Sequence, residues 1–532
     1  MSEDRLDPWF RGVLFGFAAL YLAYPSYVYY FDGVTFAMAV EGVAGGASPQ
    51  WLLHPHHLLY NFLAYAAFRG VTAAGAYPRA LEVMQWLSSL LAVLGLRLFY
   101  GVLRGIGLPS PAALAGSVLL GFSYGYWHFA TTGDTTMAAT VSLIAELAVA
   151  VRYLRSSSSL ALPALMGGLQ ALSLLMHETT AVFAPAALWL VWRGAPSSRR
   201  WTACLAFVGT AALLTVSAYV ISAVTILGVH TPRQFFSWLF FYFGPDPRTG
   251  YYVEYGSVAP SNLLASARAW LAMFVGYPPD QPGAASVPWK AASYLAVPVL
   301  LSAIAAALRN QTAAEQREWA ILRESLVFWL MLHAAVFTWW DVGNVHFWVM
   351  ALPAWCLLAA VGAARLGRGA MMRPLGVAWW APALVTLALF GGPFQNEIVP
   401  TSNRFLPIAE AIGARTEPDA TVIISGEGKY SELKAYVPYI ARRRMIVLDF
   451  QFADKTAPSE RALAALGDRI RQLSSDGGAY LLSEVLDEAL DEHFSRRHGL
   501  SGSARRAFFQ SFHPEVSADI TPTLRLLRLR AS

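Results

Sequence analysis

Acidic and imidazole side chains gather in short polar segments between the long apolar runs of this sequence. The first polar segment contains Asp32, Glu41, His54, His56 and His57. A carboxylate at a wet cavity can act as general base on an acceptor hydroxyl, which makes Asp32 the candidate catalytic residue. The structural alternative is that Asp32 caps a short helix expected over residues 33–42. The two roles are compatible, because a capping carboxylate keeps a second oxygen available.

The cluster of His54, His56 and His57 has two chemical interpretations. Together with an acid, histidines can ligate zinc or manganese. Alternatively, they can donate hydrogen bonds or charge to a phosphate. Their spacing matches no metal motif, so we expect contact with a phosphate or another part of a substrate, and we assign no metal ligand. The structural alternative is a helix start kinked by Pro55 at the level of the lipid headgroups.

Further polar residues stand at the ends of other apolar runs. They are Asp134, the pair His177 and Glu178, and the group Asp341, Asn344 and His346. As structural alternatives, helix capping explains Asp134 and the group of Asp341, Asn344 and His346, and an ion pair between helices explains His177 and Glu178. The His-Glu pair is not a zinc motif, because the second histidine of that motif is absent. Ionisable groups near hydrocarbon usually face the protein interior or a wet cavity. We therefore expect these residues to share one substrate-binding site.

The long loop 229–287 contains an aromatic segment beside two arginines, Arg233 and Arg248. Such a segment is typical of an interfacial helix. A guanidinium group binds phosphate well, so both arginines are candidates for holding an anionic lipid phosphate. Ordinary anchoring at the membrane surface is the alternative for each.

Composition identifies the elements that must position these residues. Of the 532 residues, 56% are hydrophobic and only 14% are charged, well below the charged fraction of a soluble domain. Apolar runs long enough to cross a bilayer predict about eleven spanning helices. They are expected at 11–31, 80–103, 111–131, 135–154, 160–177, 179–192, 202–228, 288–308, 319–340, 345–364 and 374–393. Cys204 and Cys356 both lie inside such runs, which argues against a disulfide framework.

Charge decides the topology. The short apolar stretch 57–70 is expected to be an interfacial helix, because the arginine-rich short loops then all fall on the cytoplasmic side together with the N-terminus. The polar segments described above then lie outside. The net charge of +5 is explained by those loops, so we predict no nucleic-acid partner. The protein is expected to be a multi-pass protein of the inner (plasma) membrane.

The composition changes after residue 393. Short β-branched runs predict strands at 421–425, 445–450 and 479–482, and helices are expected at 404–414 and 461–473. This pattern predicts a small extracytoplasmic α/β domain over 394–532, after a transmembrane domain over 1–393. The segment IISGEGKY lacks the glycine spacing of a nucleotide-binding loop.

Three of these features together resemble the GT-C membrane glycosyltransferases, in the branch of the protein O-mannosyltransferases and the lipid A aminoarabinose transferases. They are an acid after the first span, an interfacial helix opened by His54-Pro55, and Gly133-Asp134 at the end of the third span. The resemblance implies that Asp32 is the catalytic centre, that Asp134 contributes to the site, and that the donor is a polyprenyl-phosphate sugar. It does not decide whether a divalent cation takes part. One departure is Asp32-Gly33, where many members have Asp-Glu; Glu41 is the nearest substitute.

The mechanism that follows is a single inverting displacement, in which Asp32 accepts the proton of an acceptor hydroxyl and the polyprenyl phosphate leaves. The hydroxyl could belong to a glycan, a lipid or a protein, and the group transferred is expected to be a hexose or a pentose. A secondary transporter is the first alternative, although the internal halves common in transporters are not seen. A non-catalytic membrane scaffold or sensor is the second.

Overall fold

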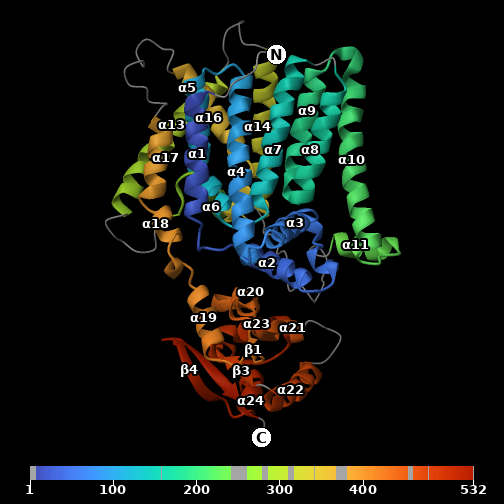
Figure 1. Cartoon of the computed structure of the whole chain (residues 1–532), viewed down its shortest axis with the longest axis vertical. Helices are drawn as coiled ribbons and strands as arrows, with labels where there is room; N and C mark the ends of the chain where they lie inside the picture. Colours follow the sequence, from blue (N-terminus) through green and yellow to red (C-terminus); the bar gives the residue numbers. More distant parts are fainter. Residues whose placement is uncertain are drawn as a thin grey trace. The chain divides into compact units, whose positions relative to one another are not determined.

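The computed structural model describes residues 7–156, 159–240, 260–277, 286–309, 317–340, 342–366, 380–452, 459–476 and 478–530. Contacts divide the chain into two compact units. The first comprises Met1–Gly33, Ala39–Val229 and Tyr255–Val399, and the second comprises Val34–Met38, His230–Glu254 and Pro400–Ser532. The first unit is helical, whereas the second contains a sheet (Figure 1).

The chain up to residue 399 forms helices that follow the apolar runs. In order they are α1 (Pro8–Ala23), α2 (Phe31–Ala44), η1 (Pro49–Leu52), η2 (Pro55–His57), α3 (Tyr60–Ala73), α4 (Ala80–Gly105), α5 (Ser110–Phe122), α6 (Tyr124–Thr131), α7 (Thr136–Arg155), α8 (Ala161–Met176), η3 (Glu178–Phe183), α9 (Ala184–Gly194), η4 (Ser197–Arg199), α10 (Arg200–Thr225), α11 (Pro232–Leu239), α12 (Pro260–Val275), α13 (Ser286–Leu308), α14 (Arg317–Trp339), α15 (Val345–Val349), α16 (Leu352–Leu366), α17 (Trp380–Phe390) and α18 (Pro393–Glu397).

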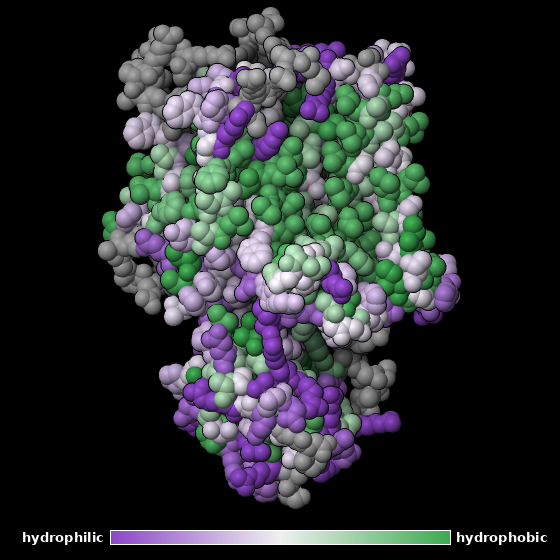
Figure 2. Space-filling model, in the orientation of Figure 1, coloured by the Kyte–Doolittle hydropathy of each residue, from purple (hydrophilic) through white to green (hydrophobic). Residues whose placement is uncertain are grey.

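The polytopic helical fold predicted from the sequence is confirmed. Among the described residues, five helices are long and apolar enough to cross a membrane, namely α4, α7, α10 with the turn before it, α13 and α14; α1, α5, α8 and α16 are shorter apolar helices. The predicted interfacial helix at 57–70 corresponds to α3. Figure 2 shows hydrophobic side chains covering the middle of the helical bundle.

Three predicted spans are interrupted rather than continuous. The run 111–131 breaks at Ser123, whose backbone is extended at φ −60° and ψ 131°, so α5 and α6 are separate helices. The run 179–192 begins as the 3-10 helix η3 before α9. The run 345–364 divides into α15 and α16. Interruptions of this kind occur at membrane depth only where protein or a wet cavity satisfies the released backbone groups.

The structure differs from the prediction in one helix limit and in one additional helix. The first span was expected over 11–31, but α1 ends at Ala23, because Pro25 cannot continue the helix. The loop 229–287 contains a helix that was not predicted, α12, whose serine, asparagine and arginine hide its apolar periodicity.

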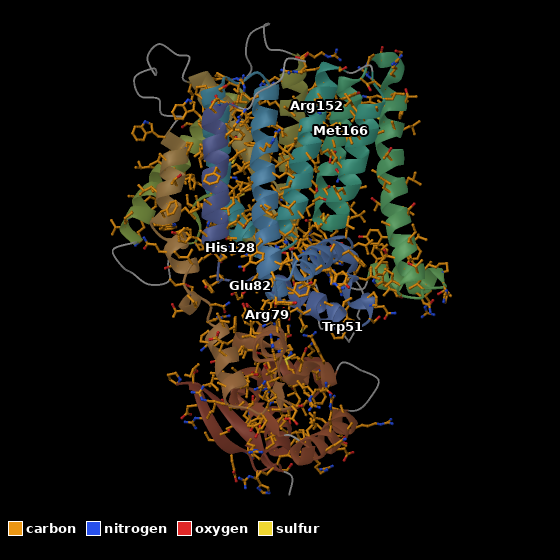
Figure 3. The ribbon with its side chains drawn as sticks, in the orientation of Figure 1. Trp51, Arg79, Glu82, His128, Arg152 and Met166 are labelled. Atoms are coloured by element: carbon orange, nitrogen blue, oxygen red, sulfur yellow. The ribbon has the colours of Figure 1, made fainter. Side chains whose placement is uncertain are left out.

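Close backbone approaches hold the bundle together. A Cβ atom at Gly362 in α16 would collide with the carbonyl oxygen of Ala303 in α13, and one at Gly167 in α8 with that of Phe207 in α10. Small residues at such crossings are typical of membrane helix packing. Of the long helices, α7 is the most enclosed. Of its most apolar stretch, 78% is buried inside the protein, whereas the corresponding share for α10 is 17%. Figure 3 shows Arg152 of α7 at one end of the bundle and His128, Glu82 and Arg79 toward the other.

The second unit contains a five-stranded sheet in the order β2-β1-β3-β5-β4. Its strands are β1 (Thr421–Ile424), β2 (Arg444–Val447), β3 (Ala479–Leu482), β4 (Glu515–Thr521) and β5 (Leu524–Leu529). The first three pair in parallel, and β5 pairs antiparallel with β3 and with β4. The predicted strands at 421–425 and 479–482 are confirmed, whereas the run 445–450 is a strand only to Val447 and continues as the helix α21 (Leu448–Gln451). The hairpin β4–β5 was not predicted, because β4 is largely exposed and has no apolar run.

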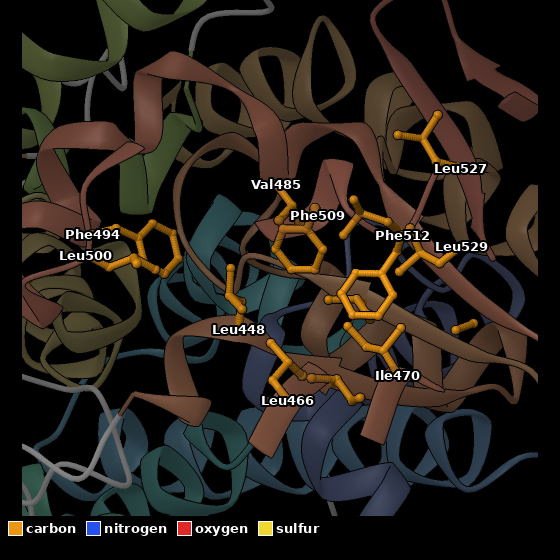
Figure 4. Packing of buried hydrophobic residues seen from close by; sticks show 14 of the residues in the cluster. Leu448, Leu466, Ile470, Val485, Phe494, Leu500, Phe509, Phe512, Leu527 and Leu529 are labelled. Atoms are coloured by element: carbon orange, nitrogen blue, oxygen red, sulfur yellow. The ribbon is translucent and has the colours of Figure 1, made fainter. Parts of the chain in front are cut away.

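Short helices surround this sheet. They are η6 (Pro400–Ser402), α19 (Leu406–Ala414), η7 (Gly428–Tyr430), α20 (Leu433–Tyr436), the π-helix η8 (Val437–Ala441), α21 (Leu448–Gln451), α22 (Ser459–Asp476), η9 (Ser483–Leu486), η10 (Glu488–Leu490), α23 (Asp491–His498) and α24 (Gly502–Gln510). The predicted helices 404–414 and 461–473 correspond to α19 and α22. Figure 4 shows the core, in which Leu448, Phe494 and Phe509 pack with Ile470 and Leu527.

Candidate active site

The candidate site is built around the start of α2. Asp32 lies in the first turn of this helix and is half-buried. The predicted N-cap role of Asp32 is wrong, because Tyr30 is the cap residue and provides no side-chain bond. A carboxylate in the first turn is still stabilised by the helix dipole. Helix α2 therefore presents Asp32 without using it as a cap.

Gly33 brings the start of α2 against the turn that carries the second predicted acid. A Cβ atom at Gly33 would collide with the carbonyl oxygen of Gly133, so the backbone of α2 rests directly on the turn that carries Asp134. Gly133 is itself wedged against α4, where a Cβ atom would lie 2.9 Å from that of Met84. The departure from the Asp-Glu pattern thus has a physical reason, because position 33 has no room for a side chain.

Asp134 is fully buried and held in one orientation. Its Oδ1 accepts a hydrogen bond from the backbone N–H of Thr135 at 2.5 Å, and its Oδ2 lies 3.1 Å from the hydroxyl of Thr136. The same Oδ2 is 3.0 Å from Nδ1 of His346. Burial raises the pKa of Asp134, but its interactions with the His346 and His177 imidazoles and the backbone N–H of Thr135 together lower it below its ordinary value. Asp134 is therefore a carboxylate at neutral pH.

Two histidines extend this carboxylate into a chain of hydrogen bonds. Nδ1 of His177 lies 3.3 Å from the backbone N–H of Thr179, which can only donate. His177 consequently carries its proton on Nε2, which is 2.9 Å from Nε2 of His346. His346 must accept there and donate from Nδ1 to Asp134. One consistent tautomer assignment therefore links Thr179, His177, His346 and Asp134.

The first-loop histidines adjoin this chain. The ring of His57 lies 4.6 Å from that of His177 and stacks on His54 at 4.9 Å. Nδ1 of His56 is 2.6 Å from Oε1 of Glu178. The pKa of His54 falls to about 3, through burial and then through the neighbouring His56. His54 is therefore neutral at physiological pH and can offer a hydrogen bond to a phosphate but no charge.

Aromatic and amide groups hold the loops around these residues. Tyr30, which caps α2, stacks on His346 at 4.8 Å, and its hydroxyl accepts a bond from Asn344 at 3.1 Å. Asn344 also caps α15, as predicted, by accepting from the backbone N–H of His346. Gln85 of α4 donates to the carbonyl oxygens of Ser26 at 2.8 Å and Thr131 at 2.9 Å. Helix α4 thus fixes both loops that carry the acids.

A second buried network was not predicted. Oε2 of Glu397 in α18 lies 2.6 Å from Nδ1 of His128 in α6 and accepts from Ser26 at 2.8 Å. Its Oε1 accepts from the hydroxyl of Tyr124 at 2.7 Å. The available signal was an imidazole inside the run 111–131 and an acid four residues after the last predicted span. Their separation of 269 residues hid the pairing.

Other predicted residues lie elsewhere or outside the described part of the chain. Glu41 receives bonds from Arg79 at 2.8 and 3.1 Å and from the backbone N–H of Ala80 at 2.8 Å. These bonds join the end of α2 to the start of α4, which is a positioning role. Arg233 is exposed on α11, in a segment grouped with the second unit. Arg248 and Asp341 fall outside the described residues.

Known proteins resemble this chain in structure but not detectably in sequence. No family model matches the sequence, and no curated protein matches it. The architecture, a polytopic bundle of apolar helices with a small C-terminal sheet, is shared with solved structures. The chain is similar to ArnT from Cupriavidus metallidurans bound to undecaprenyl phosphate, with a TM-score of 0.62 and 13% identity over 98% of each chain. The apo state of ArnT from Cupriavidus metallidurans gives a TM-score of 0.61 and 13% identity, covering 98% of this chain and 97% of that one.

Proposed function

We propose that this protein is a membrane glycosyltransferase that moves a hexosyl or pentosyl group from a polyprenyl-phosphate donor to an acceptor hydroxyl. The observation that supports the proposal is the backbone contact of Gly33 with Gly133, because it joins the turn of Asp32 to the turn of Asp134, where the buried chain through His346 and His177 begins. The fold supports it, since the similar protein ArnT was solved with undecaprenyl phosphate bound.

In the proposed step the acceptor oxygen attacks C1 of the sugar while Asp32 takes the hydroxyl proton. A bond forms between the acceptor oxygen and C1, and the bond from C1 to the phosphate oxygen breaks. The electron pair leaves with the polyprenyl phosphate, which needs no general acid because phosphate is a stable leaving group. Neutral His54 and its neighbours donate hydrogen bonds toward the developing charge. Acceptors of three kinds fit this chemistry, namely glycans, lipids and proteins.

The proposed setting is the extracytoplasmic face of the inner membrane, with the N-terminus in the cytoplasm. Arg152 lies at one end of the bundle, and the start of α4, marked by Arg79 and Glu82, lies toward the other (Figure 3). The positive-inside rule would place the arginine-rich short loops, and with them the end of Arg152, in the cytoplasm. The α/β domain over 394–532 would then lie outside, on the side where a lipid-linked sugar is consumed.

Substitution Asp32→Asn tests the catalytic assignment. Loss of a general base costs about 10²–10⁴-fold in rate, and the half-buried amide fits the same space. We expect expression and thermal stability to be retained while transfer from a polyprenyl-phosphate sugar in detergent is lost. Asp7→Asn is the matched control, because Asp7 only caps α1 and Asn is an equally good cap. Normal transfer by Asp32→Asn would remove Asp32 from its role.

A further inference from the structure

Three potential metal ligands converge in the second unit. Nε2 of His493 and Nε2 of His498 lie 2.9 and 2.5 Å from the same atom, Oδ1 of Asp449. Among the described residues, this is the one group of three His, Cys, Asp or Glu side chains whose ligand atoms all fall within 4.8 Å of one another. The histidines around Asp134 do not form such a group, so this cluster is independent of the candidate active site.

The hydrogen-bonding roles of the His498 ring nitrogens make the cluster unusual. Nδ1 of His498 is 3.2 Å from the carbonyl oxygen of Phe452, which can only accept, so this nitrogen carries a proton. In a neutral ring, Nε2 then presents a lone pair to Oδ1 of Asp449. Two acceptors facing each other at 2.5 Å repel unless a proton or a metal ion lies between them. A backbone carbonyl on one ring nitrogen, with the other nitrogen turned to a ligand site, is the usual arrangement of metal-binding histidines.

The fold holds the three residues rigidly. Asp449 is the second residue after β2, in α21, at the carboxyl end of the parallel strands, where α/β sheets usually bind ligands. Both histidines lie on α23. Core residues adjoin the cluster in the sequence, because Leu448 precedes Asp449 and Phe494 follows His493; both are labelled in Figure 4. Packing thus fixes the backbone on both sides of the site.

We propose that Asp449, His493 and His498 bind one divalent transition-metal ion, for which zinc is the best match. Two imidazoles and one carboxylate are a normal zinc set, at about 2.0–2.2 Å from the ion. Tetrahedral geometry at that distance separates ligand atoms by about 3.3 Å, so the cluster opens by less than about 1 Å when the ion enters.

The fourth coordination position is open to a water or an anionic oxygen. The His493 side chain is 24% exposed, which gives the ion access from solvent. Arg497 lies beside the site, 3.8 Å from Oδ2 of Asp449 and 3.5 Å from Glu427. With the metal bound, this guanidinium can pair with Glu427 or with an anion on the ion. The rival is a metal-free cluster in which Asp449 is balanced by an imidazolium and by Arg497.

Footprinting on the wild-type chain tests the proposal without any variant. Full-length protein in detergent is stripped with a chelator and treated with diethyl pyrocarbonate, with and without zinc chloride. Mass spectrometry then follows modification of each histidine. We expect zinc to slow the modification of His493 at least several-fold and to leave the exposed His513 of the same unit unchanged. Equal modification of His493 with and without zinc would establish the metal-free ion pair and overturn the proposal.

Metal content gives a second, independent measurement. Full-length protein is equilibrated with zinc, passed through gel filtration and assayed by elemental analysis. Asp449→Asn and His493→Ala are expected to carry one zinc equivalent fewer than the wild type. The controls Asp468→Asn and His513→Ala, both at exposed sites, are expected to match it. Identical zinc content in the wild type and in a folded His493→Ala variant would contradict the site.

Discussion

The contact between Gly33 and Gly133 allows a quantitative test of the site geometry. In Gly33→Ala, the added methyl group meets the carbonyl oxygen of Gly133 well inside van der Waals distance. Gly133 cannot retreat, because it already lies against Met84 and Leu81 of α4. Overpacking of this kind costs about 1–3 kcal/mol. A shift of about 1 Å in a reacting group costs about 10²-fold in rate, so we expect transfer to fall more steeply than stability.

The assay compares transfer from a polyprenyl-phosphate sugar with thermal unfolding in the same detergent. Gly70→Ala is the matched control, since a Cβ atom at this position of α3 meets nothing within 4 Å. We expect the control to keep full activity and to be slightly stabilised, because alanine favours helix over glycine. A Gly33→Ala variant with wild-type activity and melting temperature would refute the packing of α2 on the Gly133 turn.

Two further predictions concern buried charges. His346→Ala removes the imidazole that donates to the Asp134 carboxylate and should destabilise the protein by about 2–3 kcal/mol. His346→Gln should recover part of this stability. Thermal unfolding that is unchanged in His346→Ala would contradict the hydrogen-bond chain. In the second unit, burial raises the pKa of Glu484 to about 7 despite its bonds to Ser425. Because this folded-state pKa exceeds the unfolded value, the protonated acid contributes stability below about pH 4.5 that is lost as the pH rises through 7. Glu484→Gln should therefore gain up to about 3 kcal/mol over the wild type at pH 8 and little at pH 4, as measured by thermal unfolding; an equal effect at both pH values would refute the assignment.

The positions of the helices could be predicted from the sequence, because crossing a bilayer requires long apolar runs whatever the tertiary contacts. The interruptions at Ser123 and after His177 could not, because residues distant in the sequence bond the backbone there: the hydroxyl of Tyr21 donates to the carbonyl oxygen of Gly121, and the backbone N–H of Leu59 donates to that of Leu175. Helix α12 was missed for a similar reason, since its polar residues face partners such as Thr338 that hydropathy does not reveal.

The site was predicted in its residue types but not in its pairings. Asp134, His177 and His346 were each identified at the end of an apolar run, yet the bond between the two histidines spans 169 residues, a distance over which local patterns carry no information. Glu41 was considered as a substitute for an active-site acid, because its ion pair with Arg79 depends on how α2 meets α4. The glycine at position 33, where the proteins that the sequence resembles often have Glu, is explained only by the carbonyl oxygen of Gly133, which fills the space of a side chain there.

The chain leaves the first unit at a clamped point. Glu397, three residues before Pro400, is gripped by Ser26, Tyr124 and His128, and the backbone N–H of Tyr27 donates to its carbonyl oxygen at 2.7 Å. Ser26 and Tyr27 belong to the connecting segment that leads from α1 to Asp32. A mechanical load on the polypeptide beyond residue 400 would therefore be transmitted to the segment that carries the candidate base, so that this junction acts as a tether rather than as a passive spacer.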